Sequence, residues 1–337
     1  MVLQNNISLK PFNTFGLAVK AKQFAKVHSF AEFKQALIES ENEPHLFIGG
    51  GSNLLLTKDY DGTVILNKIK GIQIEKETDE HVYIKAYSGE NWHEFVMHCV
   101  DHHWGGIENL SLIPGTIGAA PMQNIGAYGM EIEQVFETLE AINLETLEIE
   151  NFNKVDCEFG YRESVFKRKK KGQYFIYSVT FRLTKKHKIN IDYGDIKAIL
   201  EQQNIAPELA SIKDVSNAVI AIRQSKLPDP KVLGNSGSFF KNPTISIEQF
   251  EALKIKFPSI KGYPNSEGVK VPAGWLIEQC GWKGKRVGNT GSHAQQALVL
   301  VNYGEANGNE VYQLAMDIIE SVQQTYGINL EPEVNII

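Results

Sequence analysis

Residues 105–129 have the sequence Gly105-Gly-Ile-Glu-Asn-Leu-Ser-Leu-Ile-Pro-Gly-Thr-Ile-Gly-Ala-Ala-Pro-Met-Gln-Asn-Ile-Gly-Ala-Tyr-Gly129, and they decide how the rest of the chain is interpreted. The stretch is rich in Gly, Ala, Pro and Asn, and it has neither helical nor strand periodicity. Ordering such a backbone is costly unless something packs against it. We therefore expect a partner for this segment, and the sequence on either side indicates what kind.

Three glycine-rich turns punctuate the chain: Gly49-Gly-Gly-Ser-Asn53, Ile113-Pro-Gly-Thr-Ile-Gly-Ala-Ala120 and Gln123-Asn-Ile-Gly-Ala-Tyr-Gly129. Glycine has no Cβ, so backbone N–H groups in such turns can approach a pyrophosphate closely. The first turn lacks the third glycine of a dinucleotide-binding fingerprint, and alone it is equally consistent with a plain turn. Three such turns around one ligand favour a bound nucleotide.

The flanking periodicity predicts an α+β protein. We expect an amphipathic helix at 29–41 that opens with the capping box Ser29-x-x-Glu32, a hairpin at 72–87 and a helix at 92–102. A third unit begins near Asp214. The further elements expected are strands at 46–48, 63–66, 135–143, 147–152, 174–183, 297–302 and 328–336, and helices at 195–203, 246–257, 272–280 and 309–326.

Length and charge exclude several classes of protein. A chain of 337 residues is expected to form two or three domains. Its net charge of −6 provides no overall field for nucleic acid or an anionic membrane. The three cysteines are widely spaced and form no CxxC pair, which argues against disulfides and structural zinc. Without a signal-like or membrane-spanning segment, the expected location is the cytoplasm.

Several polar residues are candidates for chemistry, and each also has a bland explanation. Arg162 follows a Gly-Tyr turn, where its guanidinium could grip a carboxylate, although composition alone favours an ordinary surface ion pair. Ser238 stands at the start of an apolar strand, where by itself it is explained as a turn residue. Glu333 lies beside a proline, where it is explained as a charge on an edge strand. His98 and His102 have metal-ligand spacing, but a helix C-terminus suits their charge, so no metal site is expected. The basic run 167–171 is interpreted as a solvated loop.

Taken together, a set of motifs in fixed order resembles the UDP-N-acetylenolpyruvoylglucosamine reductase family. The motifs are Asn13-Thr-Phe-Gly16, Gly49-Gly-Gly-Ser-Asn53, Ile113-Pro-Gly-Thr-Ile-Gly118, Gln123-Asn-Ile-Gly-Ala-Tyr-Gly129, Phe159-Gly-Tyr-Arg162, Lys226-Leu-Pro-Asp-Pro230, Gly237-Ser-Phe-Phe-Lys-Asn-Pro243 and Leu330-Glu-Pro-Glu-Val334. They cover essentially the whole chain. Tyr193 in Asp192-Tyr-Gly-Asp195 is similar to the branch whose substrate site is closed by a tyrosine loop.

The resemblance implies a three-domain flavoenzyme. Its FAD-binding module has two subdomains of the vanillyl-alcohol-oxidase type, placed at 1–70 plus 328–337 and at 71–213, and a third, α/β domain at 214–327 binds the substrate. The implied reaction reduces the enolpyruvyl ether of UDP-N-acetylglucosamine enolpyruvate with NADPH, using non-covalent FAD. The implied partner is thus a small UDP-sugar, with no nucleic acid and no membrane, and a monomer is expected.

The resemblance also assigns roles to individual residues. Ser238 is the proton donor, while Arg162 and Glu333 stabilise the enediolate-like intermediate, Glu333 in its protonated form. The residues implied in cofactor binding are Gly49, Gly51, Ser52, Asn53, Ile113, Pro114, Gly115, Gly118, Asn124, Gly126, Ala127, Tyr128 and Arg223. The residues implied in substrate binding are Tyr193, Lys226, Asn242 and Gln296. One departure from the family is the polar stretch Asn289-Thr-Gly-Ser-His293, which puts local sugar contacts in doubt.

Two alternatives stay open at this point. One is an FAD oxidoreductase of the same fold with a different substrate, against which the trio Ser238, Arg162 and Glu333 argues. The other is a nucleotide- or nucleic-acid-binding module without catalysis, for which only the glycine turns and the basic run speak. A preparation that takes up no FAD would favour the second alternative.

Overall fold

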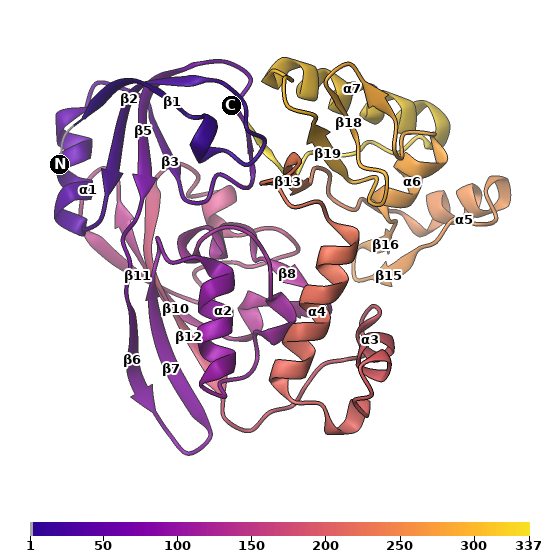
Figure 1. Cartoon of the computed structure of the whole chain (residues 1–337), viewed down its shortest axis with the longest axis horizontal. Helices are drawn as coiled ribbons and strands as arrows, with labels where there is room; N and C mark the ends of the chain where they lie inside the picture. The colour runs from indigo at the N-terminus through magenta and orange to yellow at the C-terminus, as the bar shows by residue number, and fades with distance from the viewer. Residues whose placement is uncertain (1–2) are drawn as a thin grey trace. The chain divides into compact units, whose positions relative to one another are not determined.

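The computed structural model describes residues 3–337, which divide into two compact units (Figure 1). The first unit comprises residues 3–5, 23–50 and 61–225, and the second comprises Asn6–Lys22, Gly51–Tyr60 and Lys226–Ile337. The mixture of helices and strands in both units confirms the α+β prediction. The division into three domains stays a prediction.

A five-stranded antiparallel sheet with the order β11-β10-β12-β7-β6 forms the larger part of the first unit. Its strands are β6 (Ile72–Glu77), β7 (His81–Tyr87), β10 (Phe136–Asn143), β11 (Ile149–Asn153) and β12 (Tyr174–Thr184). The expected hairpin is therefore confirmed as β6 and β7 (Figure 1). Helix α2 (Trp92–Asp101) buries Trp92 and Phe95 against Phe181 of β12. These aromatic contacts fix the sheet to the helix that precedes the glycine-rich stretch.

A smaller sheet has the order β1-β2-β5-β3. Its strands are β1 (Gln4–Ser8), β2 (Lys20–Val27), β3 (His45–Ile48) and β5 (Tyr60–Asn67), and β3 pairs with β5 in parallel. Helix α1 (Phe30–Glu39) begins as expected, because the Ser29 hydroxyl accepts from the Glu32 N–H at 3.2 Å. The Glu32 carboxylate, however, accepts from the N–H of His28, one residue before the cap.

The stretch 105–129 contains only short pieces of regular structure, as its sequence predicts. They are the 3-10 turns η2 (Glu108–Leu110), η3 (Ile117–Ala119) and η4 (Pro121–Gln123), and strand β8 (Gly126–Ala127), which pairs with β9 (Met130–Glu131). Two helices complete the unit, α3 (Ile196–Gln202) and α4 (Ile212–Lys226), and they pack on each other through Ile196, Leu200 and Val219.

The second unit combines a four-stranded sheet of order β13-β19-β18-β17 with a three-stranded sheet of order β14-β16-β15. Its strands are β13 (Gly234–Ser238), β14 (Thr244–Ile245), β15 (Tyr263–Asn265), β16 (Gly268–Lys270), β17 (Arg286–Val287), β18 (Thr290–Ser292) and β19 (Val299–Asn302), and its helices are α5 (Ile247–Lys256), α6 (Ala273–Gln279) and α7 (Gly308–Tyr326). Helix α7 opens with a full capping box of Asn307 and Glu310, and it ends at left-handed Gly327.

The prediction of one closing strand over 328–336 is wrong. The only strand there is β20 (Asn335–Ile336), which pairs in parallel with β4 (Leu54–Leu55). Pro332 has no N–H, so it interrupts the ladder, and only isolated bonds flank it. The Lys241 N–H donates to the Glu331 carbonyl at 2.9 Å, and the Glu333 N–H donates to the Phe239 carbonyl at 2.7 Å.

Candidate functional site

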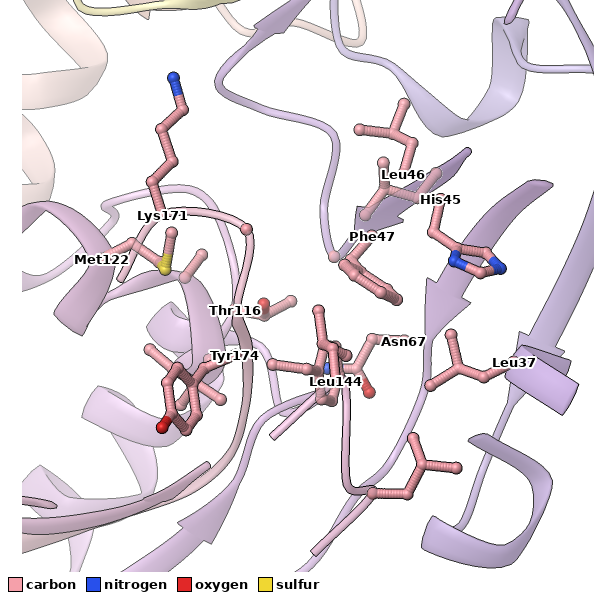
Figure 2. A pocket seen from close by; sticks show the side chains of 18 of the residues that line it. Leu37, His45, Leu46, Phe47, Asn67, Thr116, Met122, Leu144, Lys171 and Tyr174 are labelled. Atoms are coloured by element: carbon pink, nitrogen blue, oxygen red, sulfur yellow. The ribbon is translucent and has the colours of Figure 1, made fainter. Parts of the chain in front are cut away.

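A cavity of about 840 Å³ lies within the first unit, next to two of the predicted glycine turns (Figure 2). Gly49, Thr116 and Gly118 belong to its wall. Figure 2 shows Met122, Lys171 and Tyr174 on one side and Leu37, His45 and Phe47 on the other. Most of the lining is apolar, with polar groups contributed by few residues, which is the usual composition of a small-molecule site.

The first two glycine turns lie directly against each other. A Cβ on Gly49 would run into the side chain of Thr116, and a Cβ on Gly50 would stand 3.4 Å from the Cα of Gly115. The backbones can be this close because the side chains are missing. Two segments more than sixty residues apart thus form one glycine-lined wall of the cavity, as the prediction of a shared ligand requires.

The rest of the first turn belongs to the second unit. Gly51 has φ +62°, and a Cβ there would run into the carbonyl of Phe12. The Asn53 carbonyl accepts from the N–H of Asn335, and the Asn53 side chain donates to the Glu333 carbonyl at 3.4 Å. Ser52 lies between Gly51 and Asn53 in the sequence. This half of the predicted cofactor turn therefore contacts the backbone of a predicted catalytic residue.

Arg223 of α4 reaches the second glycine turn from the side. Its Nε donates to the carbonyl of Leu112, the residue before Ile113 and Pro114, at 3.2 Å. Burial lowers the pKa of Arg223, and a hydrogen bond with Tyr128 opposes that effect. The predicted cofactor residues Tyr128 and Arg223 are therefore brought together.

Arg162 lies against the third glycine turn. Its Nη2 donates to the Gly126 carbonyl at 2.6 Å, and its guanidinium lies over the Tyr161 ring. Arg162 has φ +56°, a left-handed conformation that costs an L-residue about 1–2 kcal/mol. The Lys167 ammonium donates to the Arg162 carbonyl at 3.2 Å, so the basic run supports this turn. In the same run, Lys170 lies over the Phe152 and Tyr174 rings.

The third glycine turn also contacts the tyrosine loop. Tyr193 is 57% exposed, and a Cβ on Gly129 would stand 3.4 Å from its Cβ. Asn124, by contrast, is buried, and its side chain is used inside the turn, where its Nδ2 donates to Glu131 at 2.8 Å. Asn124 therefore shapes the turn that carries Gly126 and Ala127.

Ser238 and Glu333 are neighbours in the second unit. Ser238 ends β13, and the next residue, Phe239, accepts the N–H of Glu333 at 2.7 Å. Ser238 is exposed and Glu333 is partly exposed. The structure thus brings two of the three predicted catalytic residues together, while Arg162 belongs to the first unit.

Two of the four predicted substrate residues meet at the start of α6. The Asn242 side chain accepts from the Ala273 N–H at 2.9 Å, and a Cβ on Gly274 would stand 3.3 Å from the Gln296 amide oxygen. Lys226 is exposed, and in sequence it leads into β13 through a proline-rich segment.

The polar stretch that departs from the family pattern forms part of the core of the second unit. Thr290 and Ser292 are buried in β18, and their hydroxyls donate to the carbonyls of Val301 and Ala297 at 2.8 and 3.0 Å. Their polar groups are satisfied by backbone carbonyls of the unit itself.

The His98 and His102 ring centroids lie 4.3 Å apart with the rings tilted by 42°, and the ring nitrogen Nδ1 of His102 lies 2.8 Å from the carbonyl of His98. Among residues 3–337, no group of three or more His, Cys, Asp or Glu side chains could hold a metal ion. Nor does any helix of that range combine the length and apolarity needed to cross a membrane.

The sequence reasoning missed the outer wall of the cavity. His45 and Phe47 lie on β3, which ends directly before Gly49. Their position on the strand that precedes a glycine turn was the sequence feature from which their place in the cavity wall could have been predicted. Burial lowers the pKa of His45, whose ring bonds the Ser40 hydroxyl at 2.9 Å. Leu144 and Lys171 come from distant loops, and nothing in their local sequence marks them.

Known proteins resemble this chain along its full length. Residues 22–146 match the FAD binding domain model, and residues 229–337 match the model of the UDP-N-acetylenolpyruvoylglucosamine reductase C-terminal domain. UDP-N-acetylenolpyruvoylglucosamine reductases of Flavobacterium johnsoniae and Amoebophilus asiaticus are 55% and 50% identical to the chain, with 100% of both chains covered in each case.

Solved structures agree on the fold. The crystal structure of UDP-N-acetylenolpyruvylglucosamine reductase from Thermus caldophilus covers 99% of each chain with a TM-score of 0.69 at 21% identity. A solvent-stable cholesterol oxidase covers 99% of this chain and 86% of its own, with a TM-score of 0.50 at 10% identity. The predicted fold class, an FAD-binding module joined to a further domain, is confirmed.

Proposed function

Because the chain belongs to the UDP-N-acetylenolpyruvoylglucosamine reductase family, we propose that it reduces the enolpyruvyl ether of UDP-N-acetylglucosamine enolpyruvate to UDP-N-acetylmuramate. The protein is an FAD-dependent oxidoreductase of peptidoglycan precursor synthesis. NADPH is the proposed reductant. Both nucleotide substrates are cytoplasmic metabolites, so we place the enzyme in the cytoplasm. The proposed oligomeric state is a monomer.

The cavity of the first unit suits FAD. Its volume of about 840 Å³ is within the usual range for cofactor sites, and one wall consists of backbone at Gly49, Thr116 and Gly118. A side chain at Gly49 would fill this wall, whereas backbone N–H groups can approach a pyrophosphate there. The apolar surface near Phe47 and Tyr174 offers a place for a flat ring. We assign Gly49, Gly51, Ser52, Asn53 and residues 113–118 to FAD binding.

The reaction adds a hydride and a proton across one carbon–carbon double bond. FAD, when bound, would supply the hydride-transfer chemistry, with NADPH as the hydride source and the terminal vinyl carbon as the hydride acceptor. Negative charge then develops on the carbon that bears the carboxylate and spreads into that carboxylate. The protein must stabilise this charge and deliver one proton to the same carbon.

Ser238 is the proposed proton donor, and the observation that supports it most is its position beside Glu333. A hydroxyl is a weak acid in water, but proton transfer to a carbanion is downhill, so positioning matters more than acidity. A protonated Glu333 would donate a hydrogen bond to the same substrate carboxylate. The backbone bond of 2.7 Å between Glu333 and Phe239 holds these two side chains on adjacent chain segments.

Arg162 is the proposed fixed cation. Its guanidinium is held by the Gly126 carbonyl and the Tyr161 ring, and this fixation lowers the entropic cost of gripping a carboxylate. Tyr193, Lys226, Asn242 and Gln296 are assigned to the UDP-sugar, with Lys226 neutralising its diphosphate. Arg223 is assigned to the flavin, near which its positive charge would stabilise negative charge.

The experiment that tests this function follows NADPH absorbance with FAD-loaded protein. Adding UDP-N-acetylglucosamine enolpyruvate should accelerate NADPH consumption far beyond the slow reaction with oxygen. An unchanged rate would remove the substrate assignment and favour another oxidoreductase of the same fold. A protein that takes up no FAD would remove the cofactor site as well.

A further inference from the structure

We propose that His93 is a positioning residue for FAD: its unprotonated Nδ1 holds the backbone of Leu112 and thereby the flavin-binding segment 113–118. The inference rests on the proposed placement of FAD against that segment. It adds a residue that lies outside the cavity wall and acts through the backbone.

Leu112 is held at both of its backbone polar groups by side chains. Its N–H donates to Nδ1 of His93 on α2 at 3.0 Å, and its carbonyl accepts from Nε of Arg223 on α4 at 3.2 Å. Leu112 also has φ +58°, which costs an L-residue about 1–2 kcal/mol and needs support from its surroundings. Two helices therefore fix the two peptide units on either side of one strained residue.

The residues after Leu112 are docked on the same end of α2. The N–H of Trp92 donates to the Gly115 carbonyl at 3.1 Å, and the N–H of Ile117 donates to the Glu90 carbonyl at 2.9 Å. Release of Leu112 would free the entry of this segment while the later bonds remain. The expected result is a weakened flavin site in a folded protein.

The hydrogen bond fixes the chemical state of His93. Because the Leu112 N–H is the donor, Nδ1 must carry a lone pair, and the proton of the neutral ring sits on Nε2. A protonated ring carries N–H groups at both nitrogens, so it can no longer accept. Protonation of His93 and its hydrogen bond from the Leu112 N–H are therefore mutually exclusive.

The surroundings favour the neutral ring. Burial lowers the pKa of His93 from its ordinary 6.5, the Arg223 guanidinium on α4 lowers it further, and Glu94 on α2 opposes them. Above the ordinary pKa, His93 is neutral whether or not the turn is formed, so the FAD affinity of the protein has its full value there. Affinity is then lost as the pH falls from the ordinary pKa to the lowered pKa, and it is constant again below the lowered value.

The test measures FAD binding between pH 5 and 8 by the fluorescence of released FAD. For the wild-type protein, the dissociation constant should be constant above the ordinary pKa, rise by at most about tenfold per pH unit as the pH falls from the ordinary to the lowered pKa, and level off below it. His93→Asn keeps an acceptor oxygen near the place of Nδ1 and does not titrate, so its FAD affinity should stay flat. His93→Phe should bind FAD about 3- to 10-fold more weakly than the wild type above the ordinary pKa, because one hydrogen bond is lost, and its affinity should not change with pH.

The matched control is His45→Asn, which removes the half-buried histidine of the cavity wall. If this variant becomes independent of pH while His93→Asn keeps the wild-type profile, His45 is the titrating group and the inference is wrong. Gly118→Val tests the placement of FAD separately: unchanged FAD affinity in this variant would overturn the proposed site itself, whatever the pH profiles show.

Amide hydrogen exchange of wild-type holoprotein provides a readout that needs no variant. The protection factor of the Leu112 amide should fall on acidification in parallel with FAD release. Undiminished protection of this amide while FAD dissociates would refute the role of His93.

Discussion

Replacing Lys167 by methionine should slow one half of the catalytic cycle and leave the other unchanged. Lys167 does not belong to the cavity wall, and its ammonium donates to the carbonyl of Arg162 at 3.2 Å. Methionine retains a flexible apolar stem and removes only the charged donor. Arg162 then keeps its side chain but loses support for its left-handed backbone.

The magnitude is worked from the hydrogen bond to the Arg162 carbonyl, which methionine removes. A hydrogen bond from a charged group contributes about 1.5–3 kcal/mol, and the partial exposure of Lys167 reduces this to about 1–2 kcal/mol. Since about 1.4 kcal/mol corresponds to a factor of ten in rate, we expect flavin reoxidation by the enolpyruvyl substrate to slow about 5- to 30-fold. Arg162 is proposed to act only in that step, so reduction by NADPH should keep its rate.

Anaerobic stopped-flow absorbance of the flavin separates the two half-reactions. Lys167→Arg should restore reoxidation because it restores a donor, and Lys169→Met is the matched control, since Lys169 pairs with Glu158 on the surface. Equal slowing of both half-reactions would indicate general damage to the unit. Wild-type reoxidation in Lys167→Met, alongside slow reoxidation in Arg162→Met, would refute the supporting role of Lys167.

Three further predictions concern other parts of the chain. Ser238→Ala should bind FAD and be reduced by NADPH but reoxidise at least about 100-fold more slowly with substrate, because general acid catalysis contributes about 10²–10⁴-fold; wild-type turnover would exclude Ser238 as the proton donor. Gly49→Ala should lower the FAD content of the purified protein, measured by the ratio of flavin to protein absorbance, because the new Cβ runs into Thr116. Gly50→Ala places its Cβ 3.4 Å from Gly115 and should retain more FAD. A lower FAD content in Gly50→Ala than in Gly49→Ala would contradict this packing. Of the three thiols, only Cys280 should react readily with a disulfide reagent at pH 8. Cys99 and Cys157 are buried, and burial raises the pKa of Cys157 to about 12. Rapid reaction of all three thiols in the native protein would contradict this burial.

Local features of the fold were predictable because they depend on local chemistry. The helix that starts at Ser29 and the hairpin of β6 and β7 follow from periodicity and a cap within a few residues. The irregular stretch 105–129 was also predictable, since its glycines and prolines exclude regular elements. The closing strand is shorter than predicted because Pro332 has no N–H to donate to a strand ladder.

The support of the site was not predictable, because it depends on contacts between distant residues. Leu112 is an ordinary apolar residue in the sequence, and its strained backbone is held by residues 19 and 111 positions away. Lys167 belongs to a charge run whose composition indicates only solvation, yet it reaches the carbonyl of Arg162. A motif identifies the residues that face a ligand, whereas the residues that hold the motif in place carry no such signature.

The second unit takes its parts from both ends of the chain, and this has a consequence during synthesis on the ribosome. Phe15, Leu17 and Leu55 share one buried cluster with residues of α6 and α7, such as Leu276 and Ile318. The early apolar residues emerge long before their partners, so they must wait, exposed, until more than two hundred further residues have been translated. Nascent chains should therefore bind chaperones through this amino-terminal segment, and a stalled chain ending before α7 should remain a chaperone client.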